Sequence, residues 1–246
     1  MDEMYSKYGY PSVMKFYKIM KKINPEIKFE EVDSFVKQQK SYQLHKKSKT
    51  KIQGHIVAYN ENALWFIDLL DMSNYSRQNK GYKWILLAID TFTRKAYEAA
   101  LKNKTKFEVK NGFEEIYATL DNKLIKLIIS DSGNEFLNKP MQELFKELKI
   151  RHGTVDIGDH NALGLIDRLS RTIKEIIFKD FTAKNSVKWV NNLQDYISAY
   201  NNRPHSGILD YSPNEANQHK TELISLNVKK SMPVEHNFVK IGRAHV

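Results

Sequence analysis

The 246-residue sequence contains no cysteine, and no apolar run in it approaches the about 20 residues that a membrane-spanning helix requires. Without cysteine there can be neither a disulfide framework nor a zinc site built on thiolates, which agrees with a reducing compartment. The amino terminus also lacks a secretory signal pattern, and the chain shows no internal repeat or low-complexity tract. We therefore expect a soluble, intracellular protein with no membrane partner.

The sequence has fewer acidic than basic residues. The chain has 39 Lys and Arg against 29 Asp and Glu, which gives a formal net charge of +10. Such an excess points to a polyanionic partner, with nucleic acid ahead of acidic membrane. The alternative is a basic protein with a merely solvated Lys-rich surface, and composition alone barely separates the two.

Residues 1 to about 60 are predicted to form a small helical unit without a structural zinc site. Apolar residues recur at helical spacing in two groups on either side of Pro25: Val13, Phe16, Tyr17, Met20 and Phe29, Val32, Phe35, Val36. His45 and His55 cannot complete a zinc site because no cysteine is available. The Lys-rich run 44–51 could contact phosphate or act as a nuclear address, but a solvated linker is the favoured interpretation.

From about residue 62 to 217 the sequence is first rich in strands and then in helices. The predicted strands are 64–69, 82–90, 95–101, 123–130 and 150–152. The predicted helices are about 109–120, 140–148, 166–181 and one capped by Ser186 that runs to about 200. This order predicts an α/β protein with a mixed five-stranded sheet covered by helices, the ribonuclease H-like fold.

Three aspartates in separate settings indicate a site. Asp68 lies within the first apolar strand, where an unpaired carboxylate is costly and requires a reason. Asp131 directly follows another strand, and catalytic groups often emerge at strand ends in α/β folds. Asp167 shares one face of a predicted helix with Arg171 and Lys174. Hard divalent cations prefer carboxylate oxygen, so the three acids suggest a two-metal site that cuts and joins DNA.

Several segments resemble the catalytic core of a retroviral-type integrase, and most of all the integrases of Maverick/Polinton transposable elements and virophages. The matching segments are 65–69, 130–136, 161–162, 166–174, 200–205 and 211–213. The resemblance implies an N-terminal helical region at 1–60, an integrase core at 61–217 and a C-terminal tail at 218–246. Within that tail, 237–242 resembles the first strand of an SH3-like or chromo-like domain.

The resemblance also implies a reaction and its cofactors. Asp68, Asp131 and Asp167 would bind two Mg²⁺ or Mn²⁺ ions, with Asp68 as the bridging ligand. The protein would trim the DNA ends of its element and join the 3′-hydroxyl to target DNA. Relatives act as multimers, so a homo-oligomer on DNA is expected, in the host nucleus or in a viral factory.

Five further residues are candidates for DNA contact: Arg171, Lys174, Arg168, His160 and Asn161. By the resemblance, Arg171 and Lys174 contact the element end, and a solvated helix face is the alternative. Arg168 could instead pair with a carboxylate of the sheet. His160 and Asn161 lie in a glycine-containing loop.

The sequence departs from the family pattern in two places. The third acid is Asp167 where the family has glutamate, a side chain shorter by roughly 1.5 Å. Ser132 follows Asp131 where the family usually has asparagine, and either residue can make the turn. Two alternatives therefore remain open: a transposase or nuclease on the same fold, and a DNA-binding relative with impaired catalysis.

Three other acids near these motifs are predicted not to hold metal. Asp71 is an odd number of residues beyond Asp68 on a strand, so it should face the other way. Asp90 ends a strand before a turn, and Glu135 is expected to support the turn after Asp131 or to meet a cation.

Overall fold

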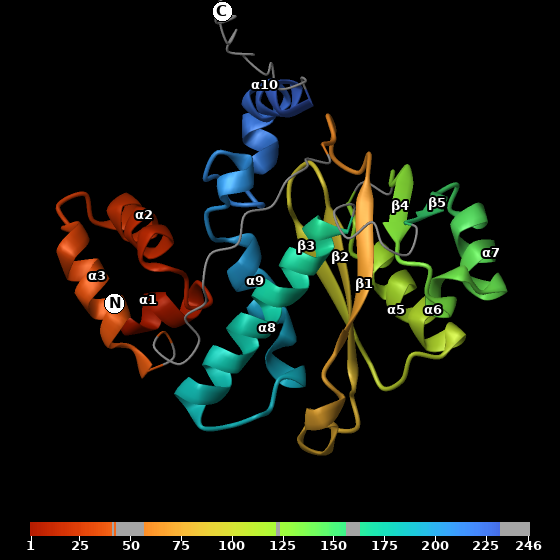
Figure 1. Cartoon of the computed structure of the whole chain (residues 1–246), viewed down its shortest axis with the longest axis horizontal. Helices are drawn as coiled ribbons and strands as arrows, with labels where there is room; N and C mark the ends of the chain where they lie inside the picture. The colour runs from red at the N-terminus through yellow and green to blue at the C-terminus, as the bar shows by residue number, and fades with distance from the viewer. Residues whose placement is uncertain (41, 43–56, 122–123, 156–162, 232–246) are drawn as a thin grey trace, which may run out of the picture.

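The computed structural model describes residues 1–40, 42, 57–121, 124–155 and 163–231. Its centre is a five-stranded sheet in the order β3-β2-β1-β4-β5 (Figure 1). The strands are β1 (Trp65–Asp71), β2 (Trp84–Asp90), β3 (Ala96–Leu101), β4 (Leu127–Ser130) and β5 (Arg151–Thr154). β1, β2 and β3 pair antiparallel, whereas β4 pairs parallel with both β1 and β5. The predicted mixed sheet is confirmed.

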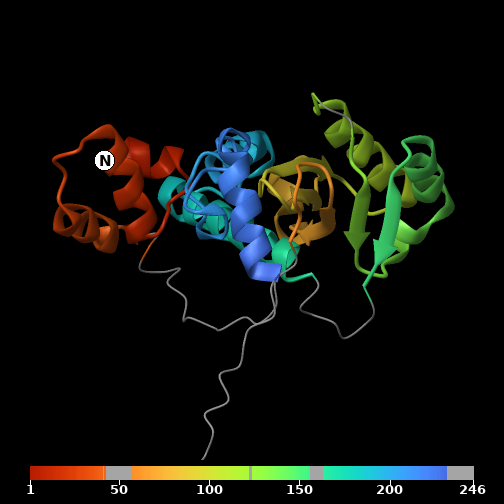
Figure 2. The same cartoon turned by 90° about the horizontal axis from the view of Figure 1, so that it is seen from above.

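Helices cover both faces of this sheet (Figures 1 and 2). They are α5 (Lys106–Ala118), α6 (Asn134–Leu137), α7 (Lys139–Glu147), α8 (Gly164–Lys184) and α9 (Leu193–Asn201). Trp65 and Ile67 of β1 pack into the core beneath α5 and α7, whereas Phe66 and Leu70 pack into the core beneath α8 and α9. Side chains alternate along a strand, so Asp68 faces α8.

Local signals fix the start of α7 as predicted. Pro140 lies in its first turn, where the missing N–H removes no helical hydrogen bond. The Asn138 side chain accepts a hydrogen bond from the Met141 N–H at 3.1 Å. Such a cap satisfies one of the helix's unpaired amide groups and typically contributes about 1 kcal/mol.

The helix predicted to start at Ser186 begins later, so that prediction is wrong. Residues Val190–Asn192 form the 3₁₀ turn η2, and α9 starts at Leu193. The reason is that a residue distant in the sequence caps the backbone N–H groups before this helix. Asn79, which follows the 3₁₀ helix η1 (Ser73–Gln78), accepts hydrogen bonds from the N–H groups of Trp189 at 2.6 Å and Val190 at 3.1 Å.

The amino-terminal residues form a helical head with its own small core. It contains α1 (Asp2–Lys7), α2 (Val13–Ile23) and α3 (Phe29–Gln38). Both predicted apolar stripes face this core, in which Tyr5, Phe16 and Val32 are fully buried. Helix α1 was not predicted. His45, His55 and the Lys-rich run 44–51 lie outside the described residues.

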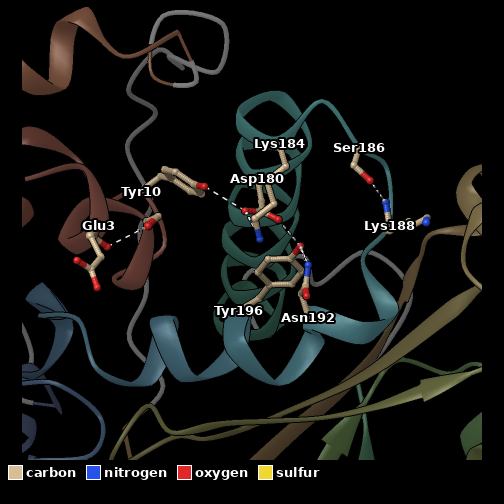
Figure 3. Close-up of polar contacts among 9 residues, drawn as sticks. Glu3, Tyr10, Asp180, Lys184, Ser186, Lys188, Asn192 and Tyr196 are labelled. Atoms are coloured by element: carbon tan, nitrogen blue, oxygen red, sulfur yellow. Dashed lines mark hydrogen bonds and ion pairs between the residues drawn. The ribbon is translucent and has the colours of Figure 1, made fainter.

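The head docks on α8 and α9 through a buried polar contact (Figure 3). Asp180 of α8 is 5% exposed and accepts hydrogen bonds from the hydroxyls of Tyr10 at 3.0 Å and Tyr196 at 2.7 Å. Lys184 pairs with the same carboxylate at 3.0 Å. Lys179 Nζ adds a hydrogen bond to the Tyr10 carbonyl at 3.1 Å. Because buried charges need partners, this network supports one specific orientation of the head.

Beyond α9 the chain returns to the core through two 3₁₀ turns, η3 (Ser206–Ile208) and η4 (Ala216–His219), and ends in α10 (Lys220–Ser231). Leu223 of α10 packs with Ala58 and Phe92, and Asn227 Nδ2 donates to the Ala58 carbonyl at 2.7 Å. The strand expected at 237–242 lies outside the described residues. Within the described part of the chain, no helix is both long and apolar enough to cross a membrane.

Candidate active site

Asp68 lies in the middle of β1 beneath the start of α8. One of its carboxylate oxygens accepts a hydrogen bond from the N–H of Leu69 at 2.7 Å. The Ser170 hydroxyl of α8 donates to the other oxygen at 3.4 Å, which is a long contact. Neither partner is a cation, so the negative charge of Asp68 is only partly compensated.

The charges of Asp131 and Asp167 both act on Asp68. Burial, and to a smaller extent these two negative charges, raise the pKa of Asp68 to about 6, while the hydrogen bonds from the Leu69 N–H and the Ser170 hydroxyl act in the opposite direction. The fold therefore brings together three carboxylates that come from β1, from the end of β4 and from the first turn of α8. A divalent cation would reduce the repulsion among like charges that act on one another in this way.

Asp131 follows the last residue of β4 and is exposed. Its Oδ1 accepts a hydrogen bond from the Gly133 N–H at 3.1 Å, which closes an Asx-type turn. The Ser132 hydroxyl donates to the Val155 carbonyl at 3.1 Å, just beyond β5. Serine thus ties the turn to the neighbouring strand.

Glu135 lies beside Asp131, across Gly133. A Cβ placed on Gly133 would lie 2.7 Å from Glu135 Oε2 and 2.9 Å from Asp131 Oδ1. The two carboxylates therefore flank the same glycine, and a side chain at this position would displace them. Glu135 is thus a fourth acid next to the candidate site, and its closeness to Asp131 along the chain was the only signal for it in the sequence.

A cross-strand hydrogen-bond chain supports the backbone of Asp131 and was not anticipated from sequence. Gln142 Nε2 lies 2.8 Å from His152 Nδ1, and His152 Nε2 lies 3.0 Å from Ser130 Oγ. Ser130 Oγ donates in turn to the Asp131 carbonyl at 2.7 Å. Because an amide NH₂ can only donate, His152 must be neutral with its proton on Nε2. Burial lowers the pKa of His152, which favours this neutral form.

Asp167 is exposed in the first turn of α8, where the helix dipole favours a carboxylate. By helical periodicity it shares a face with Ser170, Arg171 and Lys174. Arg171 is exposed, and the charge of Lys174 reaches Asp71 at the end of β1. Ser170 directs this face of α8 at Asp68, and the functional grouping of Asp167 with Arg171 and Lys174 stays a prediction.

Arg168 is on the other side of α8. It lines a cavity with Arg94 and Arg203, and among the described residues it forms no ion pair with a carboxylate of the sheet. The pairing considered for Arg168 is therefore wrong. His160 and Asn161 lie outside the described residues.

Two of the acids predicted to be structural have that role. Asp71 Oδ1 accepts the Ser73 N–H at 2.8 Å at the end of β1. Asp90 is 1% exposed, and its carboxylate accepts hydrogen bonds from the Asn62 N–H at 3.0 Å and from the N–H and hydroxyl of Thr93 at 2.7 and 2.6 Å.

The carboxylates are coupled but do not form a closed metal cage. Within the described part of the chain, no three His, Cys, Asp or Glu side chains are arranged to hold a metal ion as they stand. The donors are nevertheless of the right chemistry, since carboxylate oxygens are the ligands that Mg²⁺ prefers. Their assignment as metal ligands stays a prediction.

The order of the strands and the placement of the helices define the ribonuclease H-like integrase fold. Residues 58–160 match the integrase core domain family. The core of this chain is thus similar to those of retroviral and transposon integrases.

Two relatives are about a quarter identical to the chain over the aligned region, which is a little more than half of this chain. A transposon-derived, uncharacterized protein of Caenorhabditis elegans is 27% identical over 137 residues, which are 56% of this chain and 47% of that protein. The retrovirus-related Pol polyprotein from transposon 412 of Drosophila melanogaster is 25% identical over 139 residues, 56% of this chain and 11% of the polyprotein. The chain therefore spans less than half the length of the curated relatives that it matches.

Two solved structures are similar to the chain in fold. An integrase chain in the simian T-cell lymphotropic virus intasome bound to PP2A regulatory subunit B56 gamma superposes with a TM-score of 0.57 at 17% identity, over 86% of this chain and 69% of that one. The trimeric form of the HTLV-2 integrase catalytic core domain in complex with magnesium has a TM-score of 0.52 at 20% identity, over 63% of this chain and 95% of that one. At such identities the likeness concerns architecture alone.

Proposed function

We propose that this chain is a DNA integrase, a polynucleotidyl transferase that trims the DNA ends of its element and joins the exposed 3′-hydroxyl to target DNA. One observation carries the proposal: the charges of Asp131 and Asp167 act on Asp68, although the three residues come from separate elements. Three coupled carboxylates on a ribonuclease H-like sheet are suited to phosphoryl transfer with divalent ions.

In this proposal Asp68, Asp131 and Asp167 would hold two Mg²⁺ or Mn²⁺ ions. When bound, such a pair supplies activation of the attacking oxygen and stabilisation of the leaving oxygen in an in-line displacement. Magnesium in the HTLV-2 core supports the choice of cation. The hydrogen-bond chain from Gln142 through His152 keeps the backbone at Asp131 in place.

DNA is the proposed partner, and Arg171 and Lys174 beside Asp167 would contact its phosphates, together with Arg168, His160 and Asn161. A protein that neutralises about 6 to 10 phosphates loses on the order of 10³ to 10⁵ in affinity between about 50 and 200 mM salt. We also propose a homo-oligomer on DNA, which the intasome and the trimeric core among the similar structures support.

The motif resemblance supports a finer proposal, that the source is a Maverick/Polinton element or a virophage and that the protein acts in the host nucleus or in a viral factory. A complete reading frame and flanking DNA from the source would test the first part. Imaging of a tagged chain in the source cell would test the second.

A strand-transfer assay tests the reaction. Duplex oligonucleotides carrying the two ends of the source element would be incubated with plasmid DNA and a titration of Mg²⁺ or Mn²⁺. We expect joined products longer than the substrate, and Asp131→Asn should abolish them while salt-sensitive binding remains. Asp71→Asn is the matched control, because it removes a carboxylate from the same sheet outside the proposed site. Joining by Asp131→Asn at the wild-type rate would remove Asp131 from the mechanism.

Two alternatives give different products in the same assay. Within the alternative of a transposase or nuclease on this fold, a plain nuclease would give only shortened DNA. A DNA-binding relative would give neither product, and the shorter Asp167 is the observation that favours this outcome, since a misplacement of about 1 Å can lower a rate on the order of a hundredfold.

A further inference from the structure

A second charged site lies on the opposite side of α8 from Asp68. It is a cavity of about 320 Å³ between the head, the core and α10. Its charged or titratable lining residues are Lys15, Arg94, Arg168, Arg203, His205 and Lys230. None of the described residues that line it carries a carboxylate. We call it the cationic pocket.

Helical periodicity separates this pocket from the candidate active site. Arg168, Leu169 and Thr172 of α8 line the pocket, whereas Asp167 and Ser170 belong to the face directed at Asp68. At about 3.6 residues per turn, the two groups lie on opposite faces of the same helix. A ligand in the cationic pocket would therefore not occupy the metal-binding position.

The positive charges in the pocket are not neutralised by neighbouring acids. Among the described residues, none of the five Lys and Arg that line it forms an ion pair. The nearest acids already have other partners: Asp210 pairs with Lys18, and Glu175 pairs with Lys179 at 3.0 Å. Burial and the charge of Arg203 lower the pKa of Lys15 to about 8, as expected for a cation among cations.

Arg203 is the residue of this pocket whose hydrogen-bonding capacity is least satisfied by the protein. Its side chain is only 6% exposed, and within the described chain Nη1 alone has a hydrogen-bond partner, the Gly9 carbonyl at 3.3 Å. The fully buried Nε has none. An unpaired buried donor is costly, and a charged one more so. The guanidinium also lies over the Tyr200 ring, 5.5 Å from its centroid.

A phosphate group suits this arrangement better than a carboxylate. Arginine forks recognise both anions, but several converging cations favour the group that carries more charge and more acceptor oxygens. The volume of about 320 Å³ is roughly ten times the share of one liquid water, so a phosphate with an attached ester group fits.

We propose that the cationic pocket binds a phosphate group and that the bound group links Lys15 of the head to Arg94, Arg168 and Arg203 of the core and Lys230 of α10. The phosphate comes either from the DNA backbone or from a free phosphate. Only the DNA source rests on the function proposed above.

Binding of inorganic phosphate to the full chain tests the proposal without any activity measurement. Thermal unfolding and calorimetry would compare phosphate with chloride at equal ionic strength. We expect phosphate to raise the midpoint of unfolding, and Arg168→Gln and Lys15→Gln each to weaken phosphate binding on the order of tenfold or more. Arg151→Gln, which removes an exposed cation at the start of β5, is the charge-matched control and should bind phosphate like the wild type.

A second measurement separates the two sources. If DNA supplies the phosphate, Lys15→Gln should lower the salt dependence of duplex binding by about one counterion relative to Arg151→Gln, and free phosphate should compete with DNA. If a free phosphate is the ligand, these two variants should bind DNA alike while only Lys15→Gln loses phosphate binding. The proposal is overturned if phosphate and chloride act alike on the wild type and the two variants bind DNA equally. Loss of strand transfer with retained phosphate binding would refute the integrase function and leave the pocket intact.

Discussion

Replacing Asp68 by asparagine tests whether the coupled carboxylates destabilise the metal-free protein. Burial and the charges of Asp131 and Asp167 raise the pKa of Asp68 from 3.8 to about 6. The folded state therefore disfavours the charged form. The resulting loss in the free energy of unfolding is absent below pH 3.8, grows as the pH rises towards about 6, and is complete above that pH.

The magnitude follows from the size of the pKa shift. About two units at about 1.36 kcal/mol each give at most about 3 kcal/mol above pH 6 and roughly half of that at pH 5. Asparagine carries no charge but keeps an oxygen that can accept the Leu69 N–H, which is 2.7 Å from Asp68 Oδ1 in the native protein. Metal-free Asp68→Asn should therefore exceed the wild type in free energy of unfolding by up to about 3 kcal/mol at pH 7.5.

Urea unfolding followed by tryptophan fluorescence would measure this difference at pH 5 and pH 7.5, with and without Mg²⁺. Addition of Mg²⁺ should stabilise the wild type more than the variant, because binding to the folded state adds to stability. Asp71→Asn is the control with the opposite sign: burial raises the pKa of Asp71, but the Ser73 hydrogen bonds and the charges of Lys174 and Lys104 outweigh it and lower that pKa. The reasoning is refuted if Asp68→Asn is less stable than the wild type at pH 7.5. It is also refuted if the difference in free energy of unfolding between the two proteins does not change with pH.

Three further substitutions probe the site and the head. Asp167→Glu should raise joining in the strand-transfer assay if the native aspartate is too short, and should lower it if the site has adapted to the shorter ligand. Gly133→Ala should reduce joining at least tenfold with unchanged DNA affinity, because its Cβ would lie 2.9 Å from Asp131 Oδ1 and 2.7 Å from Glu135 Oε2 and must displace them. Asp180→Asn should lower the free energy of unfolding, measured in urea, by roughly 1 to 3 kcal/mol, because a buried acceptor of two tyrosine hydroxyls loses its charge. An unchanged midpoint of urea unfolding would mean that the docking of the head does not depend on this contact.

The elements of the core could be predicted because their signals are local. Apolar alternation and runs mark β1 to β3, and the proline at the start of α7 acts within a single turn. The grouping of Asp167 with Arg171 and Lys174 is likewise a consequence of helical periodicity alone. The carboxylate in an apolar strand at Asp68 was a signal because an isolated buried charge is costly.

One prediction failed because a contact with a residue distant in the sequence outweighs a local sequence signal. Ser186 has the chemistry of a helix cap, yet Asn79, more than a hundred positions away, holds the N–H groups of Trp189 and Val190 and delays the start of α9 to Leu193. Tertiary capping of this kind leaves no local pattern in the sequence.

The sequence by itself determined the sheet, its helical cover and the three acids, because strand and helix periodicities and the cost of burying a carboxylate are properties of short segments. Only the tertiary structure decided which charges face one another. It placed His152 behind Asp131, turned Arg168 away from the acids, and gathered cations from four other segments around Arg203. Such groupings depend on how distant segments pack, and the energy of a charge depends on all of its neighbours.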